Sequence, residues 1–264
     1  MKEQHQGNLA NNCAQVRMFG LDYCACTLAE AAQMIVDAAI EKKKGLVVTP
    51  NVDHVMGMQK DEAMFELYHR AMFRFADGMP LVWFSKCLRG KSLPERVTGA
   101  DLLPEVARLA AQNGLKLFFL GGLPGVAEKA AFKLEQHNPL LRVAGVYSPP
   151  FGFEKDDAES ERIVAMINDS GADILFVGVG APKQEKWAAR YMANLDVGPI
   201  LGVGAAFDFA AGTIKRAPLW VRCIGMEWFW RLMQEPDRLW RRYILQDSQF
   251  ILLIVKELLQ GTKS

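Results

Sequence analysis

The sequence predicts an α/β fold, with a Rossmann-like, mostly parallel sheet, flanking helices and a C-terminal α-helical appendage. Strand-like apolar runs alternate with helical patterns over most of the chain, which is typical of βαβ units. From about Gly212 the strand-like runs stop, and helical patterns continue with breaks near Pro218 and Pro236. We therefore expect an α/β core over residues 1–212 and a helical appendage over residues 213–264.

The first helix is predicted by a capping signal. Thr27 and Glu30 have the spacing of a capping box, in which each side chain bonds the backbone N–H of the other residue. The apolar residues that follow recur at helical intervals until Gly45. The segment between these signals is expected to be helical.

A buried strand is predicted next by the apolar run over 46–48, and it places Thr49 and Asn51 at its carboxyl end. The alternation then repeats. We expect helices near residues 61–71, 102–113, 124–137, 156–169 and 182–194, and strands in the runs 73–77, 116–122, 142–148, 172–180 and 199–207. Parallel sheets bind ligands beyond the carboxyl ends of their strands. The loops expected there are rich in glycine, so their N–H groups could approach an anionic ligand.

The overall composition excludes several classes of protein. The 31 basic and 30 acidic residues nearly cancel, so no general attraction to nucleic acid is expected. The five cysteines are scattered and odd in number, which favours a reducing compartment. The first fifteen residues lack the apolar segment of a secretory signal, and no apolar run is long enough to span a bilayer. We expect a cytoplasmic protein.

Several common chemical motifs are missing. The runs Gly178-Val-Gly180 and Gly202-Val-Gly204 lack the third glycine of a dinucleotide fingerprint. The histidines and cysteines do not have the spacing of a metal site. No D-x-D pair that could hold a divalent ion on a diphosphate occurs, so arginines or backbone dipoles would have to balance such a charge.

Seven segments carry a resemblance to a known family. They are TPNVDH at 49–54, FADGMP at 75–80, RVTGAD at 96–101, FLGG at 119–122, GVGAPKQE at 178–185, GVGAAFDFAAG at 202–212, and KRAP with MEWFWRLMQEPDRLWRRY at 215–243. Over residues 17–243 the chain resembles the WecG/TagA/CpsF family of glycosyltransferases. The resemblance implies an inverting, metal-independent enzyme without a cofactor that moves a sugar from a UDP-sugar to a polyprenyl-diphosphate-linked saccharide. Such enzymes build bacterial cell-surface polysaccharides at the inner face of the cell membrane. N-acetylmannosamine, its uronic acid, glucuronic acid and glucose all fit as the transferred sugar.

Asp77 matches the catalytic carboxylate residue of that family, and the resemblance implies that it acts as the base. Inverting transfer needs a base that takes the proton from the acceptor hydroxyl as it attacks the anomeric carbon, and a carboxylate can do this. The alternative is that Asp77 caps a helix that starts near Met79 or Pro80, since proline is favoured in the first turn of a helix.

The resemblance also implies a set of substrate-binding residues. Thr49, Asn51 and Gln184 match polar groups of the donor pocket, although a turn for the first two and an ordinary helix position for Gln184 explain the same residues. Arginines would stabilise the charge that develops on the departing diphosphate, because their planar fork bonds two phosphate oxygens at once. The matching arginines are Arg96, Arg231, Arg238 and Arg241.

The appendage is expected to meet the membrane surface. Residues 215–243 include seven Lys or Arg and only three Asp or Glu. Four tryptophans lie in the same segment: Trp220, Trp228, Trp230 and Trp240. We expect it to fold over the donor pocket at the membrane. A solvated amphipathic helix is the alternative, and the apolar tail could also cover a neighbouring subunit of a homo-oligomer.

Two other functions remain open from the sequence. The glycine loops would also suit another nucleotide-binding enzyme, such as an oxidoreductase, although the fingerprint is incomplete. The chain could instead be a non-catalytic membrane adaptor in which the appendage is the working part, because a fold does not establish a function.

Overall fold

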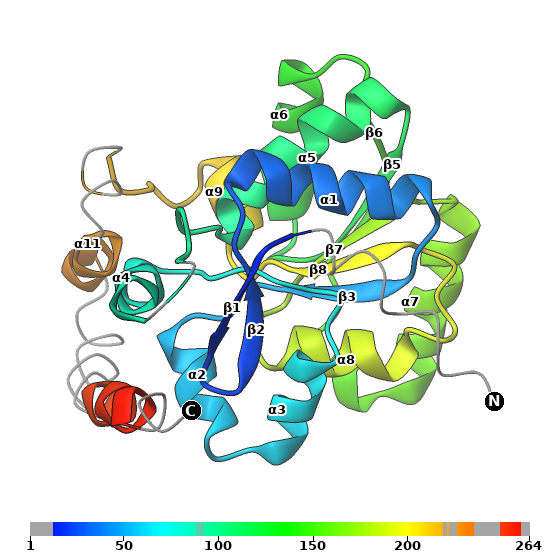
Figure 1. Ribbon diagram of the computed structural model, residues 1–264. Helices are drawn as coiled ribbons and strands as arrows, with labels where there is room; N and C mark the ends of the chain where they lie inside the picture. Colours follow the sequence, from blue (N-terminus) through cyan, green and yellow to red (C-terminus); the bar gives the residue numbers. More distant parts are fainter. Residues whose placement is uncertain are drawn as a thin grey trace.

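A computed structural model describes residues 13–88, 90, 92–218, 221, 226–234 and 249–259. Among these residues, six strands form one parallel sheet in the order β4-β3-β8-β7-β5-β6 (Figure 1). Their bounds are Gly45–Val48 for β3, Phe73–Arg74 for β4, Lys116–Gly121 for β5, Arg142–Tyr147 for β6, Ile174–Gly178 for β7 and Pro199–Gly202 for β8. The predicted α/β class with a parallel sheet is confirmed.

Helices cover both faces of this sheet (Figure 1). One face carries α1 (Leu28–Ile40), α5 (Gly99–Asn113), α6 (Val126–His137) and α9 (Ala206–Ala211). The other carries α2 (Val52–Met58), α3 (Glu62–His69), α7 (Asp157–Ser170) and α8 (Lys183–Tyr191), with the short 3-10 helix η2 (Phe153–Lys155) before α7. The five helices expected after residue 60 are therefore present, and the capping box of Thr27 and Glu30 is formed at the start of α1.

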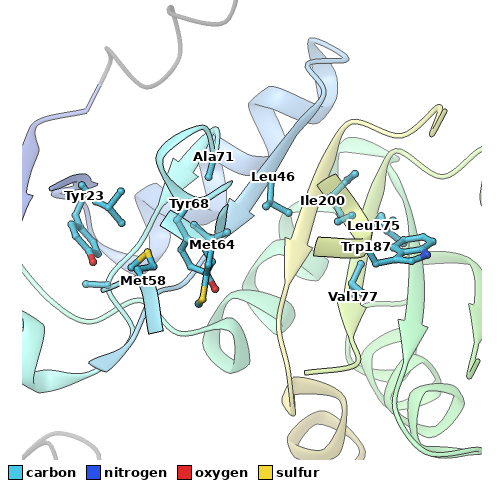
Figure 2. Packing of buried hydrophobic residues seen from close by; sticks show 14 of the residues in the cluster. Tyr23, Leu46, Met58, Met64, Tyr68, Ala71, Leu175, Val177, Trp187 and Ile200 are labelled. Carbon is cyan, nitrogen blue, oxygen red and sulfur yellow. The ribbon is translucent and has the colours of Figure 1, made fainter. Parts of the chain in front are cut away.

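The alternation of side chains along each strand fills both layers. In β5, Leu117 and Phe119 pack under α1, α5 and α6, whereas Phe118 and Leu120 belong to the cluster on the opposite face. Figure 2 shows part of this second cluster, in which Trp187 of α8 lies close to Val177 of β7. Because both faces are covered, the strands read as continuous apolar runs.

A short hairpin precedes the sheet and was not predicted from the sequence. Strands β1 (Gln15–Met18) and β2 (Leu21–Cys24) pair antiparallel around a turn in which Phe19 and Gly20 have φ of 53° and 79°. The Phe19 ring stacks on Phe84 at 4.9 Å between centroids and lies 5.6 Å from Phe250. The hairpin thus connects the core with later helices.

Three of the described helices lie along one side of the molecule: α4 (Met79–Cys87), α11 (Glu227–Gln234) and the C-terminal helix over 249–259, drawn in red (Figure 1). The C-terminal helix is anchored by Phe250, which is 5% exposed, and by the Glu257 carboxylate, which accepts a hydrogen bond from the Phe19 N–H at 2.8 Å. The boundary at residue 212 stays a prediction. None of the described helices is long and apolar enough to cross a membrane.

Two of the predicted strands are clearly shorter than expected: β4 covers only Phe73–Arg74 of the run 73–77, and β8 covers only part of the run 199–207. The run 199–207 was expected to be a strand throughout, but β8 ends at Gly202 and α9 begins at Ala206. Gly204 turns the chain between them with a φ of 53°, a conformation that glycine adopts without steric cost. The turn brings the Gly204 N–H to the carboxyl edge of the sheet.

Candidate active site

Thr49, Asn51 and Asp77 lie in two adjacent loops at the carboxyl edge of the sheet. The loops after β3 and β4 run side by side, because the Phe75 N–H donates to the Val48 carbonyl at 3.0 Å and the Asp77 N–H donates to the Pro50 carbonyl at 2.9 Å. The side chains of Thr49, Asn51 and Asp77 are all half-buried. Residues that carry a carboxylate, a hydroxyl and an amide therefore lie in adjacent loops at the edge where parallel sheets bind ligands.

The capping alternative for Asp77 is wrong. Helix α4 begins at Met79 with Pro80 in its first turn, and its N-cap is Gly78, which provides no side-chain hydrogen bond. The φ of 124° at Gly78 explains why a glycine stands there. Asp77 therefore lies one residue before the cap position.

Asn51, in contrast, does cap a helix. Its side-chain oxygen accepts a hydrogen bond from the His54 N–H at 3.2 Å, and the His54 Nδ1 accepts one from the Asn51 N–H at 3.1 Å. Burial lowers the pKa of His54 to about 4, which keeps this ring neutral and its Nδ1 free to accept. The sequence analysis suggested a turn at Asn51 and did not predict this cap, and the contact of Asn51 with a substrate stays a prediction.

Gln184 contacts two glycine-containing loops at the carboxyl edge of the sheet, those of Gly180 and Gly204. Its side chain is buried, and its Oε1 accepts hydrogen bonds at 3.1 Å from both the Gly180 N–H and the Gly204 N–H. These residues follow β7 and β8, which are neighbours in the sheet. The amide thus joins two loops within the protein, a role that the sequence did not indicate, and donor binding by Gln184 stays a prediction.

Arg96 belongs to a network of partly buried charges that joins the core to α11. The Val97 N–H donates to the Ala76 carbonyl at 2.8 Å, which holds Arg96 close to Asp77. Its Nη1 donates to the Glu227 carboxylate at 2.6 Å. We call Arg96, Asp101, Arg216 and Glu227 the ion network.

Arg216 is the centre of this network. Its guanidinium bonds both oxygens of Asp101, at 2.6 and 2.8 Å, and its Nε donates to Glu227 at 3.1 Å. The four side chains of the ion network keep between 11% and 19% of their surface exposed. Two cations and two anions are therefore matched in a largely dry environment, where removal of one member leaves a costly unpaired charge.

Both acids of the ion network are held ionised. Burial raises the pKa of Asp101, but the hydrogen bonds and the charge of Arg216 lower it more, so the pKa lies below its ordinary value. For Glu227, the effect of burial is likewise outweighed by the hydrogen bond from Arg96 and the charge of Arg216. Ionised acids keep α11 attached to the core.

A pH dependence follows from these lowered pKa values. Carboxyls with lowered pKa stabilise the folded state above their ordinary pKa of about 4, and this contribution is lost as the pH falls through their folded values. Acidification from pH 6 to pH 3 is therefore expected to accelerate hydrogen exchange of the α11 amides, after correction for the intrinsic rates. The variant Arg216→Met should have a flatter profile, and an unchanged slope in that variant would contradict the assignment.

Of the other three predicted arginines, only Arg231 lies within the residues that the structure describes. Arg231 is one turn after Glu227 in α11, and Arg238 and Arg241 fall outside the described residues. The sequence did not single out Glu185, Arg216 or Glu227 as functional residues. Arg216 lies 115 residues after Asp101, and such distant partners leave no signal in local spacing.

The described residues include no group of three or more His, Cys, Asp or Glu side chains that could hold a metal ion. Of the five cysteines, Cys13, Cys24, Cys26 and Cys87 lie in the described part and form no disulfide there, and Cys24 and Cys26 are buried. Metal independence stays a prediction to be tested.

Comparison with known proteins identifies the family. The model of the glycosyl transferase WecG/TagA/CpsF family matches residues 16–264. The chain is also 30% identical over 233 residues to the N-acetylglucosaminyldiphosphoundecaprenol N-acetyl-beta-D-mannosaminyltransferases of Staphylococcus aureus strains MW2 and NCTC 8325, with 88% of this chain and 89% of each relative covered. An oxidoreductase or a non-catalytic adaptor is not supported. The chain belongs to the WecG/TagA/CpsF family and is a glycosyltransferase.

Proposed function

We propose that this enzyme transfers N-acetylmannosamine from its UDP derivative to N-acetylglucosamine on a polyprenyl diphosphate, in the synthesis of a cell-surface polysaccharide. The names of the Staphylococcus aureus relatives describe this acceptor and a β-linked mannosaminyl product. Among the donor sugars that the sequence left open, they favour N-acetylmannosamine. An α-linked nucleotide donor would give a β-linked product by inversion.

The placement of Asp77 carries this proposal. In the proposed reaction the acceptor oxygen forms a bond to the anomeric carbon, the bond from that carbon to the diphosphate breaks, and UDP leaves with the electron pair. The Asp77 carboxylate takes the proton of the acceptor hydroxyl. Thr49 and Asn51, in the loop to which the Asp77 backbone is bonded, would orient the sugar or the diphosphate by hydrogen bonds.

Arginine would balance the negative charge on the leaving diphosphate. Arg96 is held near Asp77 and uses Nη1 for Glu227, but a guanidinium has five N–H groups, so others can serve a phosphate. Arg231, Arg238 and Arg241 are proposed to complete this role from the appendage. No divalent ion and no cofactor is needed in this scheme.

An apolar surface supports a membrane location. The helices α4, α11 and the C-terminal helix, which lie along one side of the molecule (Figure 1), carry large apolar side chains that are 44% to 70% exposed: Trp83, Phe229, Met233, Ile251, Leu252, Val255 and Leu259. We propose that this surface rests on the inner face of the cell membrane, where a polyprenyl-linked acceptor resides. A second copy of the chain in a homo-oligomer is the alternative occupant, and sedimentation with and without liposomes distinguishes the two.

A donor panel tests the proposed reaction. The enzyme is incubated with a polyprenyl-diphosphate-linked N-acetylglucosamine and, in turn, the UDP derivatives of N-acetylmannosamine, N-acetylmannosaminuronic acid, glucuronic acid and glucose. We expect UDP release with the first donor, and no loss of rate when a chelator is added. If UDP is released only with another donor, the proposed identity of the transferred sugar is wrong. If UDP release requires a divalent ion, the proposed role of the arginines is refuted.

A further inference from the structure

Gln184 can hold the two glycine loops in only one orientation of its amide. Both neighbours of its Oε1, the Gly180 N–H and the Gly204 N–H, are hydrogen-bond donors at 3.1 Å. A flipped amide would turn its NH₂ group toward these donors, and all three bonds would be lost. Some group on the other side must therefore accept from Nε2.

Glu185 provides that acceptor. Its Oε1 accepts a hydrogen bond from the Gln184 Nε2 at 2.8 Å, and the residue is 2% exposed. Space for the pair comes from β8, since a Cβ on Gly202 would lie 2.8 Å from the Gln184 Nε2 and 2.9 Å from the Glu185 Oε1. The two side chains thus fill a site that the glycine leaves open.

The buried carboxyl of Glu185 also faces the hydroxyl of Tyr68, a second buried polar group. The Glu185 Oε2 and the Tyr68 hydroxyl are both buried, neither has a partner at hydrogen-bond distance, and none of the ion pairs found in the described part of the chain includes Glu185. Burial raises the pKa of Glu185, and the hydrogen bond from Gln184, together with the backbone and the Tyr68 hydroxyl, offsets only part of that effect. An apolar side chain of similar volume would cost less to bury.

We propose that Glu185 is a positioning residue for glycosyl transfer, which fixes the amide of Gln184 and through it the spacing of the loops after β7 and β8. This role rests on the proposed function, because those loops lie beside the predicted donor site. Without the acceptor, the buried Nε2 would be left unpaired, and the amide would turn away and release the Gly180 and Gly204 N–H groups. The loops would then lose their fixed geometry.

A pair of variants separates this role from simple packing. Glu185→Gln keeps an acceptor oxygen, whereas Glu185→Met keeps the approximate volume but removes the acceptor. We expect Glu185→Met to lower kcat/KM for the donor about 10- to 100-fold, the scale of a small misplacement of binding groups. The kcat/KM of Glu185→Gln for the donor should stay close to that of the wild-type enzyme. If the methionine variant fails to fold, Glu185→Leu replaces it.

Hydrogen exchange tests the same inference without any substrate. The amide protons of Gly180 and Gly204 should exchange faster in Glu185→Met than in Glu185→Gln, while the Gly171 amide, which bonds to Asn168 in α7, stays unchanged. Equal exchange at Gly180 and Gly204 in the two variants, or equal kcat/KM, would overturn the proposal. If no UDP-sugar is turned over by the unchanged enzyme, the proposed function fails, and the exchange comparison still decides whether Glu185 holds the loops.

Discussion

Replacing Asp77 with asparagine is expected to lower kcat about 10²- to 10⁴-fold, the range typical of a lost general base, with little change in KM for the donor. Asparagine has nearly the same shape, so the loops after β3 and β4, joined through the backbone of Asp77, should keep their geometry. It cannot take the proton of the acceptor hydroxyl. Initial rates of UDP release, measured with saturating donor and acceptor, check the result.

The matched control for this experiment is Asp37→Asn. Asp37 lies near the end of α1 that leads into β3, at the opposite edge of the sheet, and accepts a hydrogen bond from Gln33 at 2.7 Å. The control makes the same chemical change away from the site, so its kcat should not fall. A kcat of Asp77→Asn equal to that of the control would exclude Asp77 as the base.

The sequence was a good guide where local chemistry determines the structure. The capping box of Thr27 and Glu30 and the apolar run over 46–48 depend on neighbouring residues, and both are present as predicted. The hairpin of β1 and β2 was missed, because four-residue strands carry little periodicity and their packing depends on Phe84 and Phe250 far along the chain.

Only part of the candidate site could be predicted, because some of its contacts depend on residues that are far apart in the sequence. Thr49 and Asn51 were placed at the carboxyl end of a strand from the order of elements alone, whereas Asp77 was singled out by the family resemblance. The roles of Gln184 and Arg96 within the fold depend on partners that no spacing reveals. Glu227 lies 131 residues from Arg96, and the Gly204 N–H reaches Gln184 only after β8 has been placed beside β7.

Replacing Arg216 with methionine is expected to detach α11 from the core. Asp101 would lose its bidentate partner and Glu227 one of its two arginines. Breaking a buried ion pair typically costs about 3–5 kcal/mol. We expect the lower end of that range, because the side chains of Arg216 and Asp101 keep 18% and 19% of their surface exposed. Faster hydrogen exchange of the α11 amides would report this loss.

The double variant Arg216→Met with Asp101→Asn separates the unpaired charge from the lost contacts. If most of the damage in Arg216→Met comes from the unpaired carboxylate of Asp101, adding Asp101→Asn should restore part of the exchange protection. The same comparison applies to catalysis, since the proposed role of Arg231 requires α11 to stay attached to the core. Activity should therefore fall in Arg216→Met. In the double variant, activity should recover to the same extent as the hydrogen-exchange protection of α11. Exchange protection that worsens in the double variant would mean that Arg216 acts through packing, and the ion network would then not be what attaches α11.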